Sequence, residues 1–365
     1  MIDVSKPFIP DISVYNKYLE RIWDKAWLTN NGPLVIELES KLKHFLQIPN
    51  LLYVTNGTIA LQLAIKALGL KGQIITTPFS YVATTSTIVW EGCEPVFVDI
   101  NPHDFNIDVA KIEAAITPQT SAILATHVYG NPCDIEAIDH IAKKHNLKVI
   151  YDGAHCFGTL YKGKSIFAYG DVSTTSFHTT KIFHTVEGGA VFAHDPEVLK
   201  AMSFMRNFGH NGRVDFVGVG INAKNSELHA AFGLANFEHI DTILARRKAQ
   251  FGLYVKILNA HGGTKLTVNP NADYNCSYFP LLFDNEKQLE KSLDELALHG
   301  IVPRRYFYPS LSTLPYVKKY HTPIADNLAS RVLCLPLYHD LRNEDIEQVC
   351  NALLLTQQKY PALSI

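Results

Sequence analysis

The feature that most constrains the fold of this chain is a regular alternation of short apolar segments with helical segments. The apolar segments are rich in β-branched residues and too short for buried helices, so each is predicted to form a strand. Strands that alternate with helices form a mostly parallel, doubly wound sheet with helices on both faces. The seven predicted strands are Leu51–Val54, Gln73–Thr77, Pro95–Ile100, Ser121–Thr126, Lys148–Asp152, Val172–Phe177 and Gly189–Ala193. The helical segments between them include Ala60–Leu68 and Ile135–His145.

The remainder of the chain follows a different pattern. An amphipathic segment, residues 14–27, lies near the start, and a long helix is predicted from about Ile240 onward. After that helix, two further helices and isolated strands are typical of an α+β arrangement. We therefore expect a large α/β domain with an N-terminal arm over residues 1–245 and a small C-terminal α+β domain over residues 246–365. The isolated strands are predicted within 274–283, 301–308 and 331–338.

The composition argues against several classes of partner. The 33 Lys and Arg residues are balanced by 35 Asp and Glu residues, so there is no cationic excess for a nucleic acid or an anionic membrane. No uncharged apolar segment reaches membrane-spanning length and residues 1–13 lack a signal-peptide pattern, so a cytoplasmic protein is expected. The six cysteines form no C-x-x-C pair, which argues against a zinc or redox site.

Ligands of open α/β sheets bind beyond the carboxyl ends of the strands, and polar residues stand at four such ends. After the first strand the chain breaks at Asn56-Gly57, and Thr58 begins a helix. Glycine lets a ligand approach the backbone, and the N–H groups of a helix start suit a phosphate, although plain connections share this pattern. Tyr81 follows the second strand, where its ring could stack on a flat ligand or belong to the core.

Asp152 ends an apolar strand, and His155 follows three residues later. A carboxylate in dry surroundings needs a partner, and a cationic ring nitrogen would suit it. The alternatives are a helix N-cap or a structural salt bridge for Asp152, and a satisfied core histidine for His155.

The loop after the strand Val172–Phe177 is the most informative segment. Lys181 lies there among Ser, Thr and His residues, whereas lysines usually lie on solvated helix faces. A lysine removed from water loses proton affinity and becomes a nucleophile that can form a Schiff base. Ser176 could donate to a phosphate beside it. His178 and His184 flank the lysine, but no carboxylate or cysteine completes a ligand spacing, so no metal is expected.

Together, a phosphate turn, an aspartate that ends a later strand and a lysine further along match the cofactor layout of fold-type I pyridoxal-phosphate enzymes. Within that group, the chain resembles the DegT/DnrJ/EryC1/StrS family of sugar aminotransferases over essentially its whole length. The segments that carry the resemblance are TNGTIALQLA, FVDINPHDFNID, HVYGNPCD, YDGAHCFG, SFHTTKIFHTVEGGAV and GINAKNSELHAAFGLANFEHID.

The resemblance implies a role for each residue that matches a family motif. Lys181 matches the lysine that carries pyridoxal 5'-phosphate as a Schiff base and moves the proton of the reaction. Asp152 matches the carboxylate that keeps the pyridine nitrogen protonated. The other matches are to groups that hold the phosphate (Gly57, Thr58 and Ser176), to the aromatic residue stacked on the ring (Tyr81) and to the residue beside it (His155).

The resemblance also implies a homodimer with shared active sites. Asn222 matches an asparagine that reaches the cofactor phosphate of the neighbouring subunit, whereas its local sequence alone favours a cap for the following helix. Two residues depart from the family pattern. Gly153 replaces the usual alanine and is expected to loosen the turn that aims Asp152. Asn225 replaces a typical methionine and is expected to alter a contact near the phosphate.

The implied activity is transfer of an amino group from L-glutamate to a nucleotide-linked keto sugar, with dTDP-4-keto-6-deoxyglucose as the expected acceptor. The segments GINAKNSE and HAAFGL favour action at C4 of the sugar over C3. A sugar dehydratase is disfavoured because such relatives replace the Schiff-base lysine with histidine. Another alternative, a cofactor-binding regulatory protein, would not need Lys181. The sequence leaves open whether the product enters the O-antigen of lipopolysaccharide, another glycan or an antibiotic.

Overall fold

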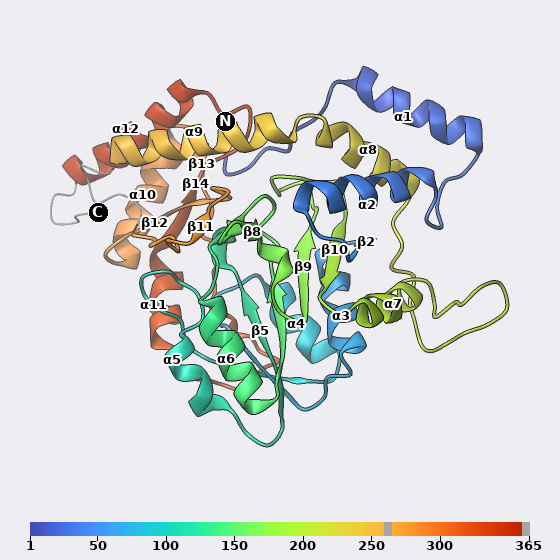
Figure 1. Cartoon of the computed structure of the whole chain (residues 1–365). Helices are drawn as coiled ribbons and strands as arrows, with labels where there is room; N and C mark the ends of the chain where they lie inside the picture. The colour runs from blue at the N-terminus through green and yellow to red at the C-terminus, as the bar shows by residue number, and fades with distance from the viewer. Residues whose placement is uncertain (259–264, 360–365) are drawn as a thin grey trace.

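The computed structural model of this chain describes residues 1–258 and 265–359, and its centre is a seven-stranded sheet (Figure 1). The strand order is β2-β10-β9-β6-β5-β3-β4, and only β10 runs antiparallel to its neighbours. The predicted, mostly parallel α/β fold is therefore confirmed. The sheet strands are β2 (Leu51–Val54), β3 (Gln73–Thr76), β4 (Glu94–Phe97), β5 (Thr120–Thr126), β6 (Lys148–Asp152), β9 (Val172–Ser176) and β10 (Gly189–Ala193).

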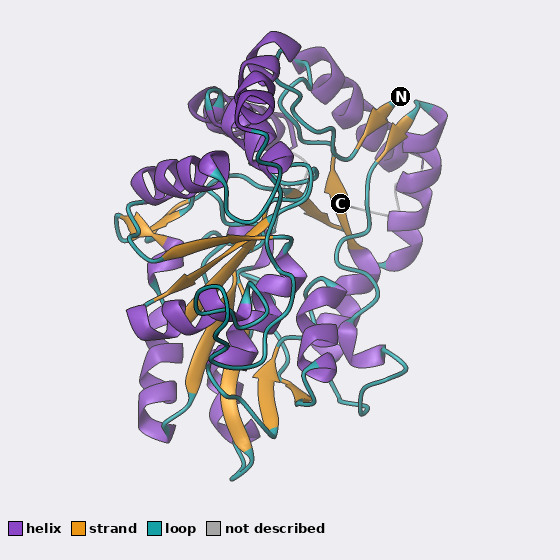
Figure 2. Ribbon diagram, turned by 90° about the vertical axis from the view of Figure 1, so that its right-hand side faces the viewer, coloured by secondary structure: helices purple, strands orange, loops and turns teal. Residues whose placement is uncertain are grey.

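Helices cover both faces of the sheet, as Figures 1 and 2 show. Successive side chains of a strand point to opposite faces, so Tyr53 packs in one core cluster and Leu52 in another. The first cluster is covered by α2 (Pro33–Leu46), α6 (Ile135–His145) and α8 (Glu227–Phe237). The second is covered by α3 (Gly57–Ala67), α4 (Val82–Trp90) and α7 (Pro196–Met205).

The predicted amphipathic opening segment is α1 (Ile12–Lys25), which packs against α8. Its N-cap is Asp11, whose carboxylate accepts from the amide of Ser13 at 2.8 Å. The remaining short helices of the first part are α5 (Val109–Ile112) and the 3₁₀ turns Glu113–Ala115, Val128–Gly130 and Ile166–Ala168. Among the residues described, no helix combines the length and the apolar character needed to cross a membrane.

The C-terminal part has a core cluster of its own, built around the long helix α9 (Ile240–Leu258). The three predicted strand regions contain β12 (Phe279–Leu282), β13 (Ile301–Val302) and β14 (Val332–Leu335). Two helices were predicted after α9, and the described residues there form three: α10 (Glu286–Leu298), α11 (Pro323–Arg331) and α12 (Asn343–Lys359). The prediction gave no bounds for its two helices, so it is one helix short of the described structure. α11 is the shortest of the three, with nine residues.

Small sheets tie the two parts of the chain together. β1 (Ile2–Asp3) pairs with β13, and β11 (Ala272–Asp273) pairs with β7 (Leu160–Tyr161), which also pairs with β8 (Lys164–Ser165). The expected domain boundary near residue 245 falls within α9 and stays a prediction; residues 259–264 and 360–365 of the second expected domain lie outside the described residues.

An aromatic cluster holds the C-terminal part against the carboxyl ends of the sheet strands. The ring of Phe79, which follows β3, lies 5.3 Å from the ring of Phe307 and 6.1 Å from that of Tyr129. The rings of Tyr129 and Phe307 stack in parallel planes. Segment 304–307 is thereby fixed over the edge of the sheet where ligands of this fold class bind.

Candidate active site

A cavity of about 320 Å³ opens at this edge of the sheet. Its walls come from the ends of β5, β6 and β9, the starts of α3 and α4, and segment 304–307. Seven of the eight predicted site residues line it: Gly57, Thr58, Tyr81, Asp152, His155, Ser176 and Lys181. The structure therefore brings together residues that are spread over more than a hundred positions of the sequence.

The register of the sheet explains why these residues meet. Asp152 pairs with Thr126 on one side and Thr174 on the other, so β5 and β6 end at the same level and β9 extends two residues beyond it. Ser176 pairs with Gly189 of β10, and Gly189 pairs in turn with Val54 at the end of β2. The start of α3 consequently lies beside Ser176.

The turn into α3 forms a cradle for an anion. Asn56 caps the helix: its side chain accepts from the amide of Ile59 at 2.8 Å and its carbonyl from the amide of Ala60 at 3.1 Å. Within the described chain this leaves the amides of Gly57 and Thr58 to a ligand, because the first amides of a helix have no intrahelical acceptor. A Cβ on Gly57 would lie 3.0 Å from the Cβ of Ser176, so glycine allows this close approach.

The carboxylate of Asp152 is buried and held in one orientation. The hydroxyl of Thr84 donates to its Oδ2 at 2.8 Å, and the amide of Ala154 donates to its Oδ1 at 3.1 Å. No helix begins at this aspartate, and no residue in the described part of the chain forms a salt bridge with it, so both structural alternatives are excluded. Burial raises the pKa of Asp152, while the two hydrogen bonds and the charge of Lys181 lower it.

His155 is buried beside the cavity with an incomplete set of partners. Its ring stacks on that of Phe307 at 5.6 Å, and its Nε2 lies 3.3 Å from the hydroxyl of Tyr306. Its Nδ1 has no hydrogen-bond partner in the described chain. The pKa of His155 is lowered by burial and then by the charges of Lys181 and Arg304, which favours the neutral ring. The alternative of a satisfied core histidine is therefore excluded.

Lys181 lies half-buried in the loop between β9 and β10, with its backbone amide donating to the carbonyl of His178 at 2.9 Å. Its ammonium group makes no hydrogen bond or ion pair with any residue that the structure describes. Burial lowers the pKa of Lys181 to about 8, the carboxylate of Asp152 opposes this shift, and the charge of Arg304 adds to it. The group is thus an amine that loses its proton readily.

This pKa leads to a prediction for the protein without ligand. A neutral amine is nucleophilic and an ammonium is not, so labelling of Lys181 by an amine-selective reagent should rise with pH and reach half its plateau near pH 8. Peptide mass spectrometry over a pH series would measure it. A Lys181 profile that rises only near the ordinary lysine value of 10.5 would contradict the desolvated environment.

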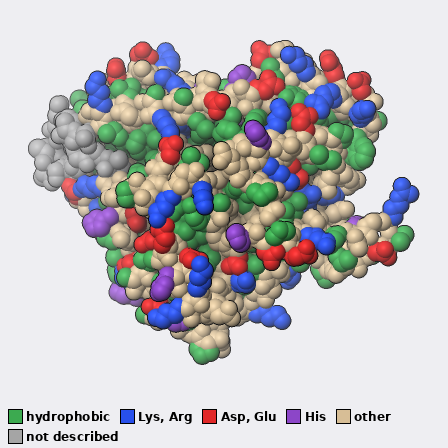
Figure 3. Space-filling model, in the orientation of Figure 1, with side chains coloured by type: hydrophobic (Ala, Val, Ile, Leu, Met, Phe, Trp, Pro, Cys, Tyr) green, Lys and Arg blue, Asp and Glu red, His purple; other side chains and the backbone are tan. Residues whose placement is uncertain are grey.

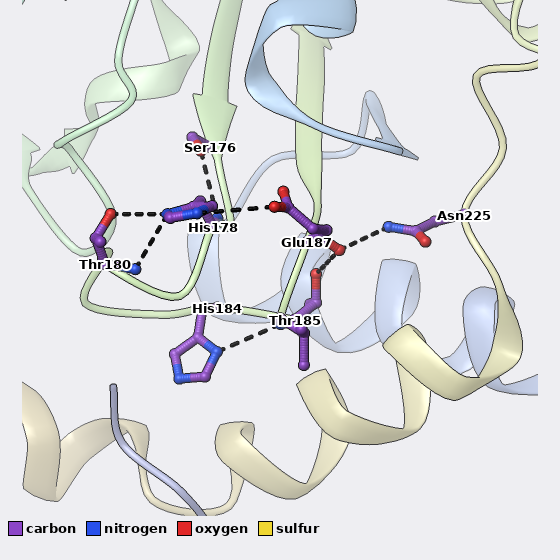
Figure 4. Close-up of polar contacts among 8 residues, drawn as sticks. Ser176, His178, Thr180, His184, Thr185, Glu187 and Asn225 are labelled. Atoms are coloured by element: carbon purple, nitrogen blue, oxygen red, sulfur yellow. Dashed lines mark hydrogen bonds and ion pairs between the residues drawn. The ribbon is translucent and has the colours of Figure 1, made fainter. Parts of the chain in front are cut away.

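Hydrogen bonds fix the loop that carries Lys181, as Figure 4 shows. The hydroxyl of Thr185 donates to the carbonyl of Glu187, and the side-chain amide of Asn225 donates to the same carbonyl, both at 2.8 Å. His178 lies 2.9 Å from the hydroxyl of Thr180 and 3.7 Å from the carboxylate of Glu187. The described residues contain no cluster of three or more His, Cys, Asp or Glu side chains suited to a metal ion.

The structure shows the surroundings of the two residues that depart from the family pattern, and the effect of Asn225 on a contact near the phosphate stays a prediction. Gly153 does not loosen its turn: its amide donates to the carbonyl of Thr174 at 2.9 Å, and a Cβ would lie 2.7 Å from the ring of Phe167. Asn225 does not line the cavity. It instead donates to the hydroxyl of Tyr53 at 2.9 Å and to the Lys181 loop.

Asn222 is the one predicted site residue that lies outside the cavity of its own chain. It ends a hairpin, residues 207–222, whose two ends pair with each other and which projects from the body (Figures 1 and 3). Its Oδ1 accepts from the ammonium of Lys224 at 2.8 Å. It does not cap α8, because Ser226 does. Its role across a subunit interface stays a prediction.

Several residues that line the cavity or support its lining residues were not predicted. Ser80 and Thr84 belong to a hydroxyl chain that ends on Asp152, with 2.7 Å between their oxygens. Serines and threonines in TTPFSYVATT carry no distinctive signal for this role. Arg304, Tyr306 and Phe307 come from a segment that was predicted only as an isolated strand. The paired arginines and aromatics of VPRRYFY were the available signal.

Comparison with known proteins adds evidence that is independent of this geometry. The model of the DegT/DnrJ/EryC1/StrS aminotransferase family matches residues 12–354. A dTDP-4-amino-4,6-dideoxy-D-glucose transaminase of Escherichia coli is 40% identical, over 97% of this chain and 98% of the relative. A protein of the same name from Shigella dysenteriae is 41% identical, over 96% and 98%.

A solved structure is similar over nearly the whole fold. The structure of DesI in the presence of its TDP-sugar product has a TM-score of 0.91 and 29% sequence identity, and the match covers 99% of this chain and 94% of that one.

Proposed function

Because the chain belongs to the DegT/DnrJ/EryC1/StrS aminotransferase family, we propose that it is a pyridoxal 5'-phosphate enzyme that aminates a nucleotide-linked keto sugar. The proposed reaction transfers the amino group of L-glutamate to dTDP-4-keto-6-deoxyglucose and forms dTDP-4-amino-4,6-dideoxyglucose. The names of two relatives, at 40% and 41% identity, support this sugar. The observation that carries the proposal is an unpaired lysine of low pKa in the same cavity as a buried aspartate.

The chemistry of the cavity fits this cofactor. A phosphate suits the amides of Gly57 and Thr58 and the nearby hydroxyl of Ser176. A protonated ring nitrogen suits the buried carboxylate of Asp152, and the unsatisfied Nδ1 of His155 can bond to a polar group of the same ring. With the amine of Lys181, the cavity thus contains a phosphate cradle, a negative charge for the ring nitrogen and a reactive amine.

Each residue then has a defined task. When bound, the cofactor stores the amino group between the two substrates and withdraws electrons from the reacting carbon. Asp152 holds a proton on the ring nitrogen. The hydroxyl of Thr84 and the amide of Ala154 fix the orientation of its carboxylate by hydrogen bonds. The amine of Lys181 removes and returns the proton at the reacting carbon, for which a pKa near the working pH is favourable. Tyr81, the N-cap residue of α4, lines the cavity with an aromatic ring that can stack on the flat ring of the cofactor.

The substrate proposal is tested by incubating the cofactor-loaded protein with L-glutamate and single nucleotide sugars. dTDP-4-keto-6-deoxyglucose should give the 4-amino product, identified by NMR, together with 2-oxoglutarate. A GDP-linked 4-keto sugar and a nucleotide-linked 3-keto sugar should react at least about 10-fold more slowly, since specificity is a difference of transition-state binding. Preference for the 3-keto sugar would replace the C4 assignment, and no amine transfer to any sugar would overturn the proposed function.

We further propose that the protein is a homodimer in which Asn222 completes the partner's phosphate site. The 207–222 hairpin supports this proposal because it projects from the body and exposes large apolar side chains (Figure 3). Such exposure is typical of surfaces that meet a partner. The exposed side chains are Phe208, Val214, Phe216, Val217, Val219 and Ile221.

Complementation between two inactive variants tests the shared site. Asn222→Asp should place a negative charge against the partner's phosphate and abolish cofactor retention, and Lys181→Ala should be inactive for lack of the amine. In a mixed dimer, one site receives both wild-type residues. Equal mixing under subunit exchange should therefore restore about a quarter of wild-type activity, since half of the dimers are mixed and each has one intact site of two.

The control for this experiment is Asn211→Ala, a change on the same hairpin that leaves Asn222 intact. This variant should retain cofactor. If mixing restores no activity although mass spectrometry detects mixed dimers, or if an isolated monomer turns over, the cross-subunit role of Asn222 is wrong.

A further inference from the structure

Four polar groups at the loop that carries Lys181 close a ring of hydrogen bonds. The side-chain amide of Asn225 donates to the hydroxyl of Tyr53 at 2.9 Å, and that hydroxyl donates to Oγ1 of Thr185 at 2.8 Å. The hydroxyl of Thr185 donates to the carbonyl of Glu187, which the second N–H of the Asn225 amide also reaches, both at 2.8 Å (Figure 4). Because each donor has an acceptor within the ring, every member fixes the orientation of the next.

The ring joins the loop to two elements that are distant in sequence. Tyr53 belongs to β2, and Asn225 directly precedes Ser226, the N-cap of α8. The Oδ1 of Asn225 accepts from the amide of Ser226 at 2.9 Å, which leaves both of its side-chain N–H groups for the ring. The side chains of Tyr53, Thr185 and Asn225 are buried and do not line the cavity. Any effect they have on a ligand is therefore exerted through the loop.

The ring spans a strained residue. Val186, between Thr185 and Glu187, has a φ of 68°, in the left-handed region that a β-branched residue rarely adopts. Its side chain is 38% exposed, so its own packing compensates little of this strain. A strained backbone of this kind persists only where its surroundings hold it in place. The carbonyl of Val186 accepts from the amide of Thr179 at 3.0 Å, and this bond closes the segment that contains Lys181.

The base of the loop is held separately from the ring. The amide of Phe177 donates to the carbonyl of Gly188 at 2.7 Å, and β9 pairs with β10 beyond this bond. We therefore expect that loss of the ring loosens the loop and leaves the sheet intact.

We infer that Asn225 is a positioning residue for Lys181. Through its ring with Tyr53 and Thr185, it holds Val186 in the left-handed conformation and so fixes the loop that presents the amine to the cavity. The inference rests on the proposed function only in taking Lys181 as the reacting group. A displacement of about 1 Å at a reacting group costs about 10²-fold in rate, so a slight loosening of the loop has a large effect.

The test breaks the ring at three different members, with Asn225→Leu, Thr185→Val and Tyr53→Phe, so that it does not depend on the folding of one variant. In cofactor-loaded protein each should lower kcat about 10-fold or more and leave the KM of both substrates within about 3-fold. Thr185→Ser keeps the hydroxyl and should retain about half of the wild-type kcat or more. In protein without cofactor, the pH of half-maximal Lys181 labelling should rise from about 8 toward 10.5, because a looser loop admits water to the amine.

A double variant tests whether the ring acts through the strained residue. Asparagine adopts the left-handed region more readily than valine does, and it adds none of the backbone freedom of glycine. Val186→Asn combined with Asn225→Leu should therefore recover most of the lost kcat and shift the labelling profile back toward the wild type. If the double variant recovers neither, the ring does not act through Val186 and the inference is wrong.

Asn106→Leu is the matched control, because Asn106 is also buried and donates to two backbone carbonyls, those of Asn131 and Pro132, away from the cavity. This variant should have a lower melting temperature and unchanged labelling of Lys181. Unchanged kcat and labelling in Asn225→Leu would overturn the inference, as would an equal shift of the labelling profile in the control. Labelling that responds as expected in a protein whose wild type transfers no amine would overturn the proposed function alone.

Discussion

Lys181→Ala should reduce amine transfer by about 10⁴-fold or more, at the upper end of what a positioned proton-transfer group contributes. No other lysine lines the cavity, so no described residue can replace the missing amine. The phosphate cradle, Asp152 and His155 remain in the variant. Pyridoxamine phosphate should therefore still bind, and its absorption spectrum in the purified variant would show this.

Chemical labelling locates the reactive amine in the wild-type protein. Reduction of the cofactor-loaded protein with borohydride, followed by peptide mapping, should attach the cofactor to Lys181 alone. Lys143→Ala serves as the control, because that lysine is exposed on α6 and pairs with Asp139 of the same helix. The control should keep full activity. Cofactor on a different lysine, or turnover by Lys181→Ala above one hundredth of the wild-type rate, would remove the assignment.

Asp152→Asn should lower kcat by about 10²- to 10³-fold, comparable to the loss of one preorganised electrostatic group at an active site. The carboxylate lies in a buried position where its negative charge favours a protonated ring nitrogen, and a neutral amide cannot hold that proton. The change should appear in kcat more than in cofactor binding, because the phosphate and ring contacts are untouched. Stopped-flow measurement of the half-reaction with L-glutamate would isolate this effect.

The fold should tolerate the same substitution. The Asn oxygen can still accept from the amide of Ala154, and the hydroxyl of Thr84 can rotate to accept from the new amide group. We expect the free energy of unfolding to change by about 1 kcal/mol. Asp99→Asn is the matched control, since Asp99 is also buried but binds the amides of Ile324 and Ala325 away from the cavity. Near-wild-type kcat in Asp152→Asn would contradict the role of the carboxylate.

The strands, and the polar residues that follow them along the chain, could be predicted because both depend on local sequence. An apolar β-branched segment of a few residues specifies a strand wherever it packs, and β2, β6 and β10 have the predicted bounds. A polar residue at the end of such a strand must lie at one edge of a parallel sheet. This rule placed Asp152 and the turn at Gly57 at the site, and it placed Lys181 in the loop that follows β9.

Local reasoning was less successful where a residue's role depends on its contacts. Glycine in place of the usual alanine was expected to loosen the turn at residue 153, yet the ring of Phe167 and the carbonyl of Thr174 occupy the space around Gly153. After α9, the described residues form one helix more than the two that were predicted without bounds. The hydroxyl of Thr84 could not be assigned to Asp152, because the contact joins α4 to β6 across 68 positions of sequence.

The sequence by itself determined which residues carry the chemistry, Lys181 and Asp152, and the type of sheet that presents them. The tertiary structure alone decided what surrounds these groups. It brought Arg304 and Tyr306 from the C-terminal part to the cavity, and it paired Arg305, next to Arg304, with Glu286. It also set the pKa of Lys181 to about 8 through burial. The physical reason is that strand formation follows from neighbours in the chain, whereas desolvation and charge depend on atoms that only the folded chain brings close.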